Sequence, residues 1–160
     1  MATRRTGYGA SERENSMTTT EQLPLVESVQ QLLGMAELED VVYYGMSAVR
    51  RGENDPEKTS DSYALFVRHD GVRLEVRCRA TVDTDDAQYV VDAASQFSLA
   101  EPVNITEVAQ QEFVQKVGLL AVWPYIRETI SANAAKLRLA PMQVKLLRAE
   151  DVHITATPPE

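Results

Sequence analysis

Hydrophobic and polar residues alternate most clearly between positions 72 and 82. The apolar face consists of Val72, Leu74, Val76, Cys78, Ala80 and Val82, and the opposite face of Arg73, Glu75, Arg77, Arg79 and Thr81. A period of two indicates a β-strand with one buried face. β-branched and aromatic residues predict three more strands, at 41–49, 63–68 and 87–97. Turn sequences at Asp70-Gly71 and 83–86 then favour an antiparallel meander.

Apolar residues recur at helical spacing on both sides of these strands. Residues 23–36 predict a short amphipathic helix. Asn104 and Glu107 have the spacing of a capping box that would begin a later helix. Gly118 weakens that helix, and Pro124 suits the first turn of another, which ends before Pro141. The predicted fold class is therefore α+β, with a four-stranded antiparallel meander sheet followed by two C-terminal helices.

The apolar residues divide the chain into three parts. Residues 1–22 contain little that could be buried and are predicted to form a disordered arm. Residues 23–150 form a single predicted domain, and 151–160 a C-terminal tail. The 160-residue length suits one domain with a modest core.

Charge and composition exclude several classes of protein. The net charge is −8, and residues 1–20 carry +1, so the predicted domain is clearly acidic. This balance argues against a nucleic-acid binder, which needs clustered cations. No secretory signal is visible, and the longest apolar run, Leu119–Trp123, is far too short to span a bilayer. The chain has one cysteine and so forms no internal disulfide, which favours a cytoplasmic protein.

Candidate catalytic groups are few. His69 and His153 belong to no recognisable metal-binding spacing, and the glycines form no phosphate-binding loop. Cys78 lies on the apolar face of its strand, which favours a buried structural thiol over a nucleophile. The sequence therefore predicts no enzyme, no metal and no cofactor.

The feature with functional content is a surplus of apolar surface. The strand at 41–49 is apolar on both faces, and the helix after residue 104 carries its own apolar stripe. Exposed apolar area of this kind marks an interface or a binding groove. Its burial is favourable by about 25 cal/mol per Å² for any apolar partner. Such a groove would bind many sequences.

Two motifs carry a family resemblance. They are Trp123-Pro124-Tyr125-Ile126-Arg127-Glu128 and Leu137-Arg138-Leu139-Ala140-Pro141-Met142. They resemble the Phe-Pro-Tyr-Ala-Arg-Glu and Leu-Asn-Leu-Ala-Pro-Val-Asn-Phe segments of the SecB family of export chaperones. The resemblance covers roughly residues 38–148 and includes the order of strands before helices. It implies a holdase that binds unfolded polypeptides without ATP, as a dimer of dimers.

The resemblance also implies functional positions. The client-binding groove would consist of Val41, Tyr43, Phe97, Leu99, Ile126, Ile130, Leu137 and Leu139. The oligomer interface would include Tyr89, Val91, Ala93, Val108 and Val114. Val90 and Asp92 match positions where the family docks the motor SecA through an acidic sheet face. Here that face carries Arg73, Arg77 and Arg79, and a positive strip would repel a partner suited to a negative one. It is either a solvated face or a docking patch for an acidic partner.

Several functions remain open from sequence. A chaperone for protein export and a dedicated chaperone of the antitoxin in a toxin–antitoxin system would share one mechanism and differ in client. An oligomeric adaptor with one fixed partner would use the same apolar surface. A small α+β enzyme or ligand carrier would need an ionisable residue on the inward strand faces, and the alternating strand offers only Val, Leu, Ala and Cys there. The sequence leaves the client, SecA binding and the choice between dimer and tetramer undetermined.

Overall fold

The computed structural model describes residues 22–145, 147 and 153–154. The predicted arm lies outside this range except for Gln22, and so does the tail except for 153–154. The elements in chain order are β1 (Leu25–Val26), α1 (Val29–Met35), β2 (Ala36–Arg50), β3 (Ser60–His69), β4 (Arg73–Asp83), β5 (Ala87–Leu99), β6 (Asn104–Ile105), α2 (Glu107–Phe113), the π-helical segment η1 (Val114–Gly118), α3 (Leu119–Lys136) and β7 (His153–Ile154).

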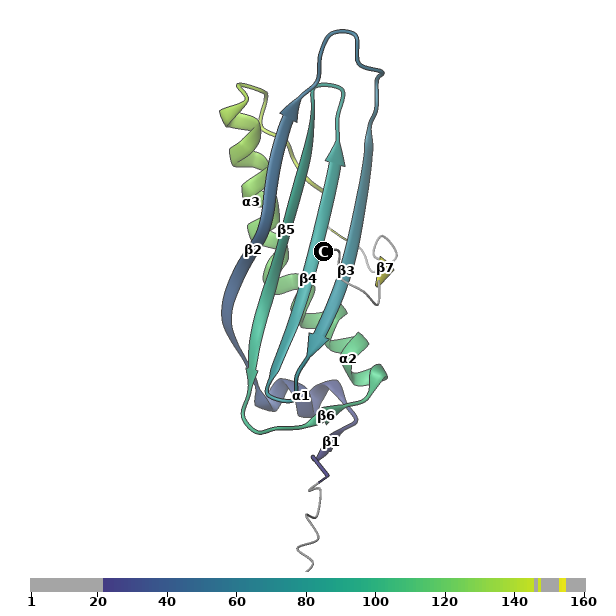
Figure 1. Cartoon of the computed structure of the whole chain (residues 1–160), viewed down its shortest axis with the longest axis vertical. Helices are drawn as coiled ribbons and strands as arrows, with labels where there is room; N and C mark the ends of the chain where they lie inside the picture. Colours follow the sequence, from purple (N-terminus) through teal and green to yellow (C-terminus); the bar gives the residue numbers. More distant parts are fainter. Residues whose placement is uncertain (1–21, 146, 148–152, 155–160) are drawn as a thin grey trace, which may run out of the picture.

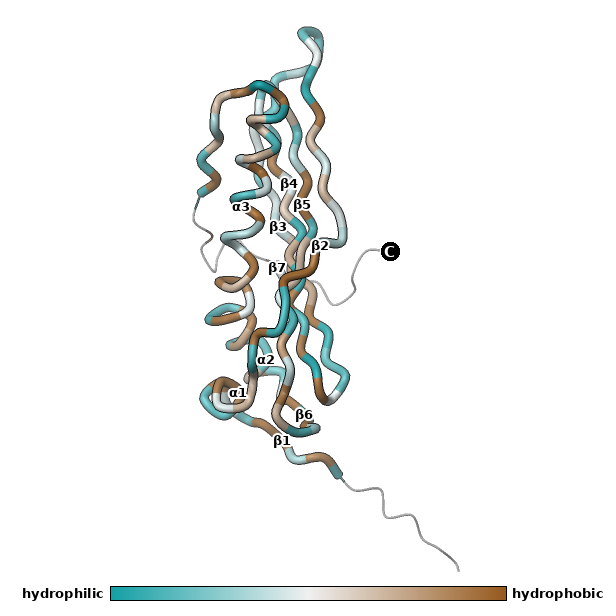
Figure 2. Tube along the Cα trace, turned by 90° about the vertical axis from the view of Figure 1, so that its left-hand side faces the viewer, coloured by the Kyte–Doolittle hydropathy of each residue, from teal (hydrophilic) through white to brown (hydrophobic). Residues whose placement is uncertain are grey.

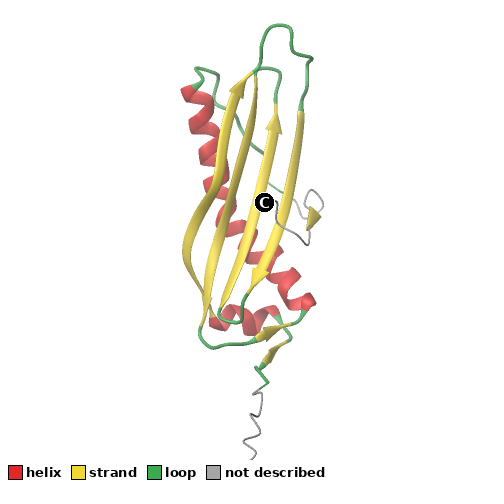
Figure 3. Ribbon diagram, viewed as in Figure 1, coloured by secondary structure: helices red, strands yellow, loops and turns green. Residues whose placement is uncertain are grey.

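The molecule has two layers, a long antiparallel sheet and a helical layer on one of its faces (Figures 1, 2 and 3). The predicted α+β class with a four-stranded antiparallel sheet is confirmed. The strand order is β2-β5-β4-β3-β7, with β7 parallel to β3. Only β3, β4 and β5 follow the predicted meander, because β2 lies beside β5. The connection at 51–59 is too long to force a local hairpin, and it carries the chain across the sheet in a Greek-key arrangement.

The core lies between the sheet and the helices. Alternate residues of β4 and β5 face α3, and the largest of them are fully buried. Two edge-to-face aromatic pairs join the layers, Phe97 with Phe113 at 5.0 Å and Tyr63 with Trp123 at 5.3 Å between ring centroids. Such pairs stabilise beyond the area they bury. The sheet therefore has one covered face, called the helix side here, and one outer face on which no described helix lies (Figure 2).

The N-terminal helix is shorter than the predicted 23–36. It spans only Val29–Met35, because β1 pairs in parallel with β6 and holds the preceding residues extended. Ser28 and Gln31 form a capping box at the start of α1. The capping box predicted at Asn104 is not formed, because Asn104 lies in β6, and the N-cap of α2 is Thr106, which accepts a hydrogen bond from the Ala109 amide at 3.3 Å.

The two predicted C-terminal helices are one continuous helical rod from Glu107 to Lys136. Gly118 does not end the helix but allows it to approach the sheet. A Cβ at Gly118 would lie 2.7 Å from Val76 Cβ, and the Ser95 hydroxyl donates to the Gly118 carbonyl at 2.9 Å. Pro124 lies inside α3 and does not begin it. Its ring leaves the Leu120 carbonyl without an intrahelical donor, and Leu120 is 65% exposed, so water can hydrate this site.

Asp83, the last residue of β4, lies at the end of the sheet opposite α1 and bonds to residues that follow β2, precede β3 and belong to β5. It is 3% exposed and ion-paired with Arg51 and Lys58. Burial alone would raise its pKa, but hydrogen bonds from Gln88, Lys58 and Arg51 outweigh this effect and hold the pKa below its usual value.

Acid should therefore weaken the fold through Asp83. A depressed folded-state pKa stabilises the native chain above the unfolded value of about 3.9, and this contribution is lost as pH falls through the folded pKa. We expect urea midpoints to fall steeply below about pH 4. Asp83→Asn should be less stable at neutral pH and should fall less steeply. If the urea midpoints of the wild type and of Asp83→Asn fell equally steeply as the pH was lowered, this role of Asp83 would be contradicted.

Candidate functional site

Strand β2 forms an open edge of the sheet. It is 15 residues long and pairs with β5 on one side, with no partner strand on the other among the described residues. Residues 41–49 contain no charge, although charged residues commonly protect such edges. Leu38 is 45% exposed, Met46 53% and Val49 61%. A long, apolar and unprotected edge can accept an extended polypeptide strand.

Part of this apolar surface lies on the helix side of the sheet. Leu38 pairs with Phe97 and Met46 with Val91, two β5 residues that point toward the helices. Leu38 and Met46 therefore share a side with the core but remain exposed, because β2 is at the margin of the helical layer. Figure 2 shows hydrophobic residues along this part of β2.

Tyr43 connects β2 to α3 by two hydrogen bonds. Its hydroxyl donates to the Tyr125 carbonyl at 3.3 Å and accepts from the Thr129 hydroxyl at 3.0 Å. Val41 and Tyr43 are half-buried against the core. We call Leu38, Val41, Tyr43 and Met46 the β2 edge surface. It is a row of apolar side chains along one margin of the helix.

The chain turns back sharply after α3. Arg138 has φ 57°, and the Leu139 amide donates to the Ala134 carbonyl at 3.0 Å, the geometry of a left-handed helix cap. Leu137 and Leu139 are half-buried and pack on the core. Residues 141–144 then lie against α3 and border a shallow hollow of about 550 Å³. The Leu-x-Leu-Ala-Pro motif thus closes the end of the helix.

The structure does not bring the eight predicted groove residues together. Phe97, Leu99, Ile126 and Ile130 are buried inside the subunit. Phe97 and Leu99 end β5 near α1, whereas Leu137 and Leu139 follow α3 at the opposite end of the sheet (Figure 1). Val41, Tyr43, Leu137 and Leu139 keep part of their surface accessible.

The predicted oligomer positions divide in the same way. Tyr89, Val91, Ala93 and Val114 are buried within the subunit, because β5 is a central strand whose helix side is covered. Val108 is 65% exposed, since it faces away from the sheet. Leu120 on α3 is equally exposed but is not among the predicted interface residues, because the sequence predicts a break at Gly118 and not a continuous helix.

The predicted docking position Asp92 is occupied by an ion pair. Its two carboxylate oxygens accept from Arg77 Nε at 2.7 Å and Arg77 Nη2 at 2.8 Å. Asp92 is only 6% exposed, and the Arg77 guanidinium lies 4.1 Å from the centre of the Tyr44 ring. The hydrogen bond to Asp92 raises the pKa of Arg77. Val90 is half-buried beside this pair. Of the basic strip, only Arg73 and Arg79 are exposed.

The remaining candidate groups offer little chemistry. Burial raises the pKa of Cys78 to about 12, with a further contribution from the negative charge of Asp92, so this thiol is inert in the folded chain. His69 is half-buried on β3, and the side chain of His153 lies outside the described residues. Within the described ranges, no cluster of three histidine, cysteine or acidic residues could hold a metal. No helix there has the length and hydrophobicity needed to cross a bilayer.

Comparison with known proteins identifies the family. No protein-family model matches the chain. The SecB-like chaperone SmegB of Mycolicibacterium smegmatis is 37% identical over 134 residues, which is 82% of this chain and 89% of the relative. Among solved structures, the fold resembles the SecB-like chaperone Rv1957 of Mycobacterium tuberculosis, in complex with a ChAD peptide from the antitoxin Rv1956 HigA1. The TM-score is 0.62 at 20% identity, over 74% of this chain and 92% of that one. With this degree of identity over nearly the whole of SmegB, the chain belongs to the SecB-like chaperones.

Proposed function

We propose that this protein is an ATP-independent holdase that binds non-native polypeptides along the β2 edge surface, extended by Leu137 and Leu139. The observation that carries the proposal is the row of exposed apolar side chains along the edge of β2, which has no partner strand there among the described residues. An extended client would gain backbone hydrogen bonds from β2 and apolar contacts from Leu38 and Met46. Both are insensitive to client sequence, as a holdase requires. Ile126 and Ile130 support this surface from the core without contacting the client.

Two classes of client fit this mechanism. We favour an antitoxin segment, because the structural neighbour Rv1957 was solved with an antitoxin peptide. Export clients delivered to SecA are the alternative. The outer sheet face favours them less, because Asp92 is already saturated by Arg77 and would not be free for a basic partner. An adaptor with one fixed partner would use the same edge but would ignore unrelated peptides.

We also propose that the subunits associate through the exposed face of the helical layer. Val108 in α2 and Leu120 in α3 are each 65% exposed there, and Val117 and Ala121, within three residues of Leu120, are partly exposed. An apolar stripe on a helix that faces away from its own sheet favours helix-to-helix contact between copies. This assignment leaves the β2 edge surface open for clients. The native mass would distinguish monomer, dimer and tetramer.

The proposal predicts that a charge on β2 abolishes client binding. The wild-type protein should suppress light scattering by a model protein diluted from guanidinium, at near-stoichiometric ratio and without nucleotide. Met46→Glu should weaken this effect at least about tenfold, because it places a charge where an apolar client contact forms. The ChAD peptide of HigA1, added as a competitor, should displace the client.

The matched control is Val72→Glu, which adds the same charge at an apolar residue of similar exposure (44%) in the β3–β4 turn. Its activity should equal that of the wild type. Undiminished aggregation in the presence of excess wild-type protein would exclude the holdase. If the protein bound the ChAD peptide but did not reduce the aggregation of unrelated unfolded clients, the fixed-partner adaptor would be favoured.

A further inference from the structure

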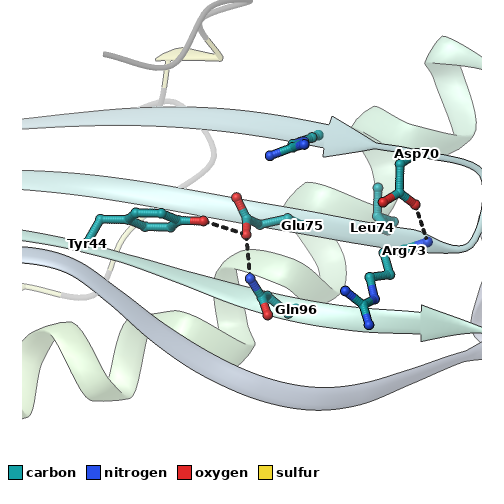
Figure 4. A pocket seen from close by; sticks show the side chains of 7 residues that line it. Tyr44, Asp70, Arg73, Leu74, Glu75 and Gln96 are labelled. Carbon is teal, nitrogen blue, oxygen red and sulfur yellow. Dashed lines mark hydrogen bonds between the residues drawn. The ribbon is translucent and has the colours of Figure 1, made fainter. Parts of the chain in front are cut away.

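The outer face of the sheet carries two adjacent shallow hollows that share Tyr44. The first, of about 160 Å³, is lined by Tyr44, Arg68, Asp70, Arg73, Leu74, Glu75 and Gln96 (Figure 4). The second, of about 430 Å³, includes Arg77, Arg79, Val90 and Asp92. We call the two together the outer trough. It lies on the face opposite α3 and contains none of the residues that we assign to subunit association.

The carboxylates of the outer trough already accept hydrogen bonds from within it. Asp92 is held by Arg77 through both oxygens. Glu75 accepts from the Tyr44 hydroxyl at 2.8 Å and from Gln96 Nε2 at 2.7 Å, as Figure 4 shows. Asp70 accepts from the backbone amides of Val72 and Arg73 at 3.2 and 2.9 Å, and these bonds lower its pKa. The three carboxylates therefore already have hydrogen-bond donors within the protein.

Three guanidinium groups of the trough form no ion pair with any described residue. Arg68, Arg73 and Arg79 are exposed and form no ion pair within 4.0 Å in the described part of the chain. The strand register places Arg79 directly opposite Asp92, but Arg77 occupies both oxygens of that carboxylate. Each free guanidinium presents five donors in a planar fork that matches a carboxylate. The trough thus offers cationic donors in a protein whose net charge is −8.

We infer that the outer trough binds an extended acidic segment of a partner protein. Arg73 and Arg79 lie six residues apart on one face of β4, which is roughly 20 Å along a strand. An extended segment with carboxylates at that spacing would reach both. A central apolar side chain would contact the ring of Tyr44, which lies between them beside Glu75 and Arg77. A long polyanion such as nucleic acid fits less well, because the acidic remainder of the molecule repels it.

This site is separate from the proposed client site, although Met46 borders both at the edge of β2. The test therefore uses Arg73 and Arg79. The probe is a fluorescein-labelled peptide, Asp-Glu-Ser-Gly-Leu-Gly-Ser-Asp-Glu, with a matched peptide in which Asn and Gln replace the acidic residues. Fluorescence anisotropy should show binding of the acidic peptide only, weakening as salt is raised. The double variant Arg73→Gln/Arg79→Gln should bind it roughly tenfold more weakly.

The control is Arg127→Gln/Arg138→Gln, which removes two exposed positive charges from the helical layer and should bind the peptide as the wild type does. Equal binding of the neutral peptide, or no effect of the Arg73/Arg79 variant, would overturn the inference. Displacement of the peptide by an equal concentration of a single-stranded oligonucleotide of the same charge would also overturn it, in favour of a general anion site. Aggregation suppression by the Arg73/Arg79 variant should be normal, so failure here leaves the holdase proposal standing.

Discussion

Replacing Arg77 with methionine is expected to destabilise the folded chain by about 3 kcal/mol, the largest effect of a single surface-strand substitution that we foresee. The side chains of Arg77 and Asp92 are 15% and 8% exposed. Without the guanidinium, the buried Asp92 carboxylate would lose both of the hydrogen bonds that it accepts from Arg77. The cation–π contact with Tyr44 would be lost as well. Urea unfolding at neutral pH measures the change in the free energy of unfolding.

Two further variants isolate the cause. Arg79→Met removes an exposed, unpaired arginine from the same strand face and should change stability by less than about 0.5 kcal/mol. Arg77→Met combined with Asp92→Leu should recover most of the loss, because no buried charge remains. Equal effects of Arg77→Met and Arg79→Met would show that the ion pair contributes nothing.

Gly118→Ala is expected to destabilise the chain by about 2–3 kcal/mol, although alanine is the better helix former. The added methyl would lie 2.7 Å from Val76 Cβ and 2.9 Å from Val76 Cγ1. Real Cβ atoms do not approach so closely, so the helix or β4 must shift. The shift would also strain the Ser95 hydrogen bond to the Gly118 carbonyl. Thermal and urea unfolding measure this loss.

Gly34→Ala supplies the matched control, because a Cβ there meets nothing within 4 Å and lies in helix α1. It should stabilise the chain by about 0.5–1 kcal/mol. Val76→Ala should partly rescue Gly118→Ala, since it removes the two γ carbons that clash while Cβ remains, and the two changes should be non-additive. A Gly118→Ala protein as stable as Gly34→Ala would mean that the helix does not approach the sheet at this residue.

The strands were predictable where one face of the sheet is covered and the other is not. β4 alternates because its odd-numbered residues face solvent and its even-numbered ones face α3, and the buried set Leu74 to Val82 follows directly. The predicted boundaries of β2 were too narrow. Its first residues, such as Glu37 and Glu39, are polar because an edge strand is exposed even where it is paired. Polar residues gave no local sign that the strand continues.

The helix boundaries were less predictable because tertiary contacts override local preference. Gly118 and Pro124 indicate breaks in an isolated helix. In the folded chain, packing on Val76 requires a residue without a side chain, and the exposed position of Leu120, one turn before Pro124, tolerates the proline. The sequence could not assign these residues to one rod, because the cause lies on a strand about 40 residues away in the chain.

The apolar surplus was visible in the sequence, but its location was not. The resemblance placed Phe97, Ile126 and Ile130 in a groove, whereas the subunit buries them between sheet and helix. Met46 and Leu38, which remain exposed on the helix side, carry no signal that distinguishes them from core residues. The deciding fact is that β2 is an edge strand, and edge or centre is a property of strand order.

By itself, the sequence determined the α+β class, the turn at Asp70-Gly71, the buried face of β4 and the family. These features depend on local periodicity, turn chemistry and short motifs, all of which are written in neighbouring residues. The tertiary structure alone decided which strand lies at the edge, which apolar residues stay exposed, and which arginine neutralises Asp92. Each of these depends on residues that are distant in the chain and meet only when the sheet assembles, so no local pattern encodes them.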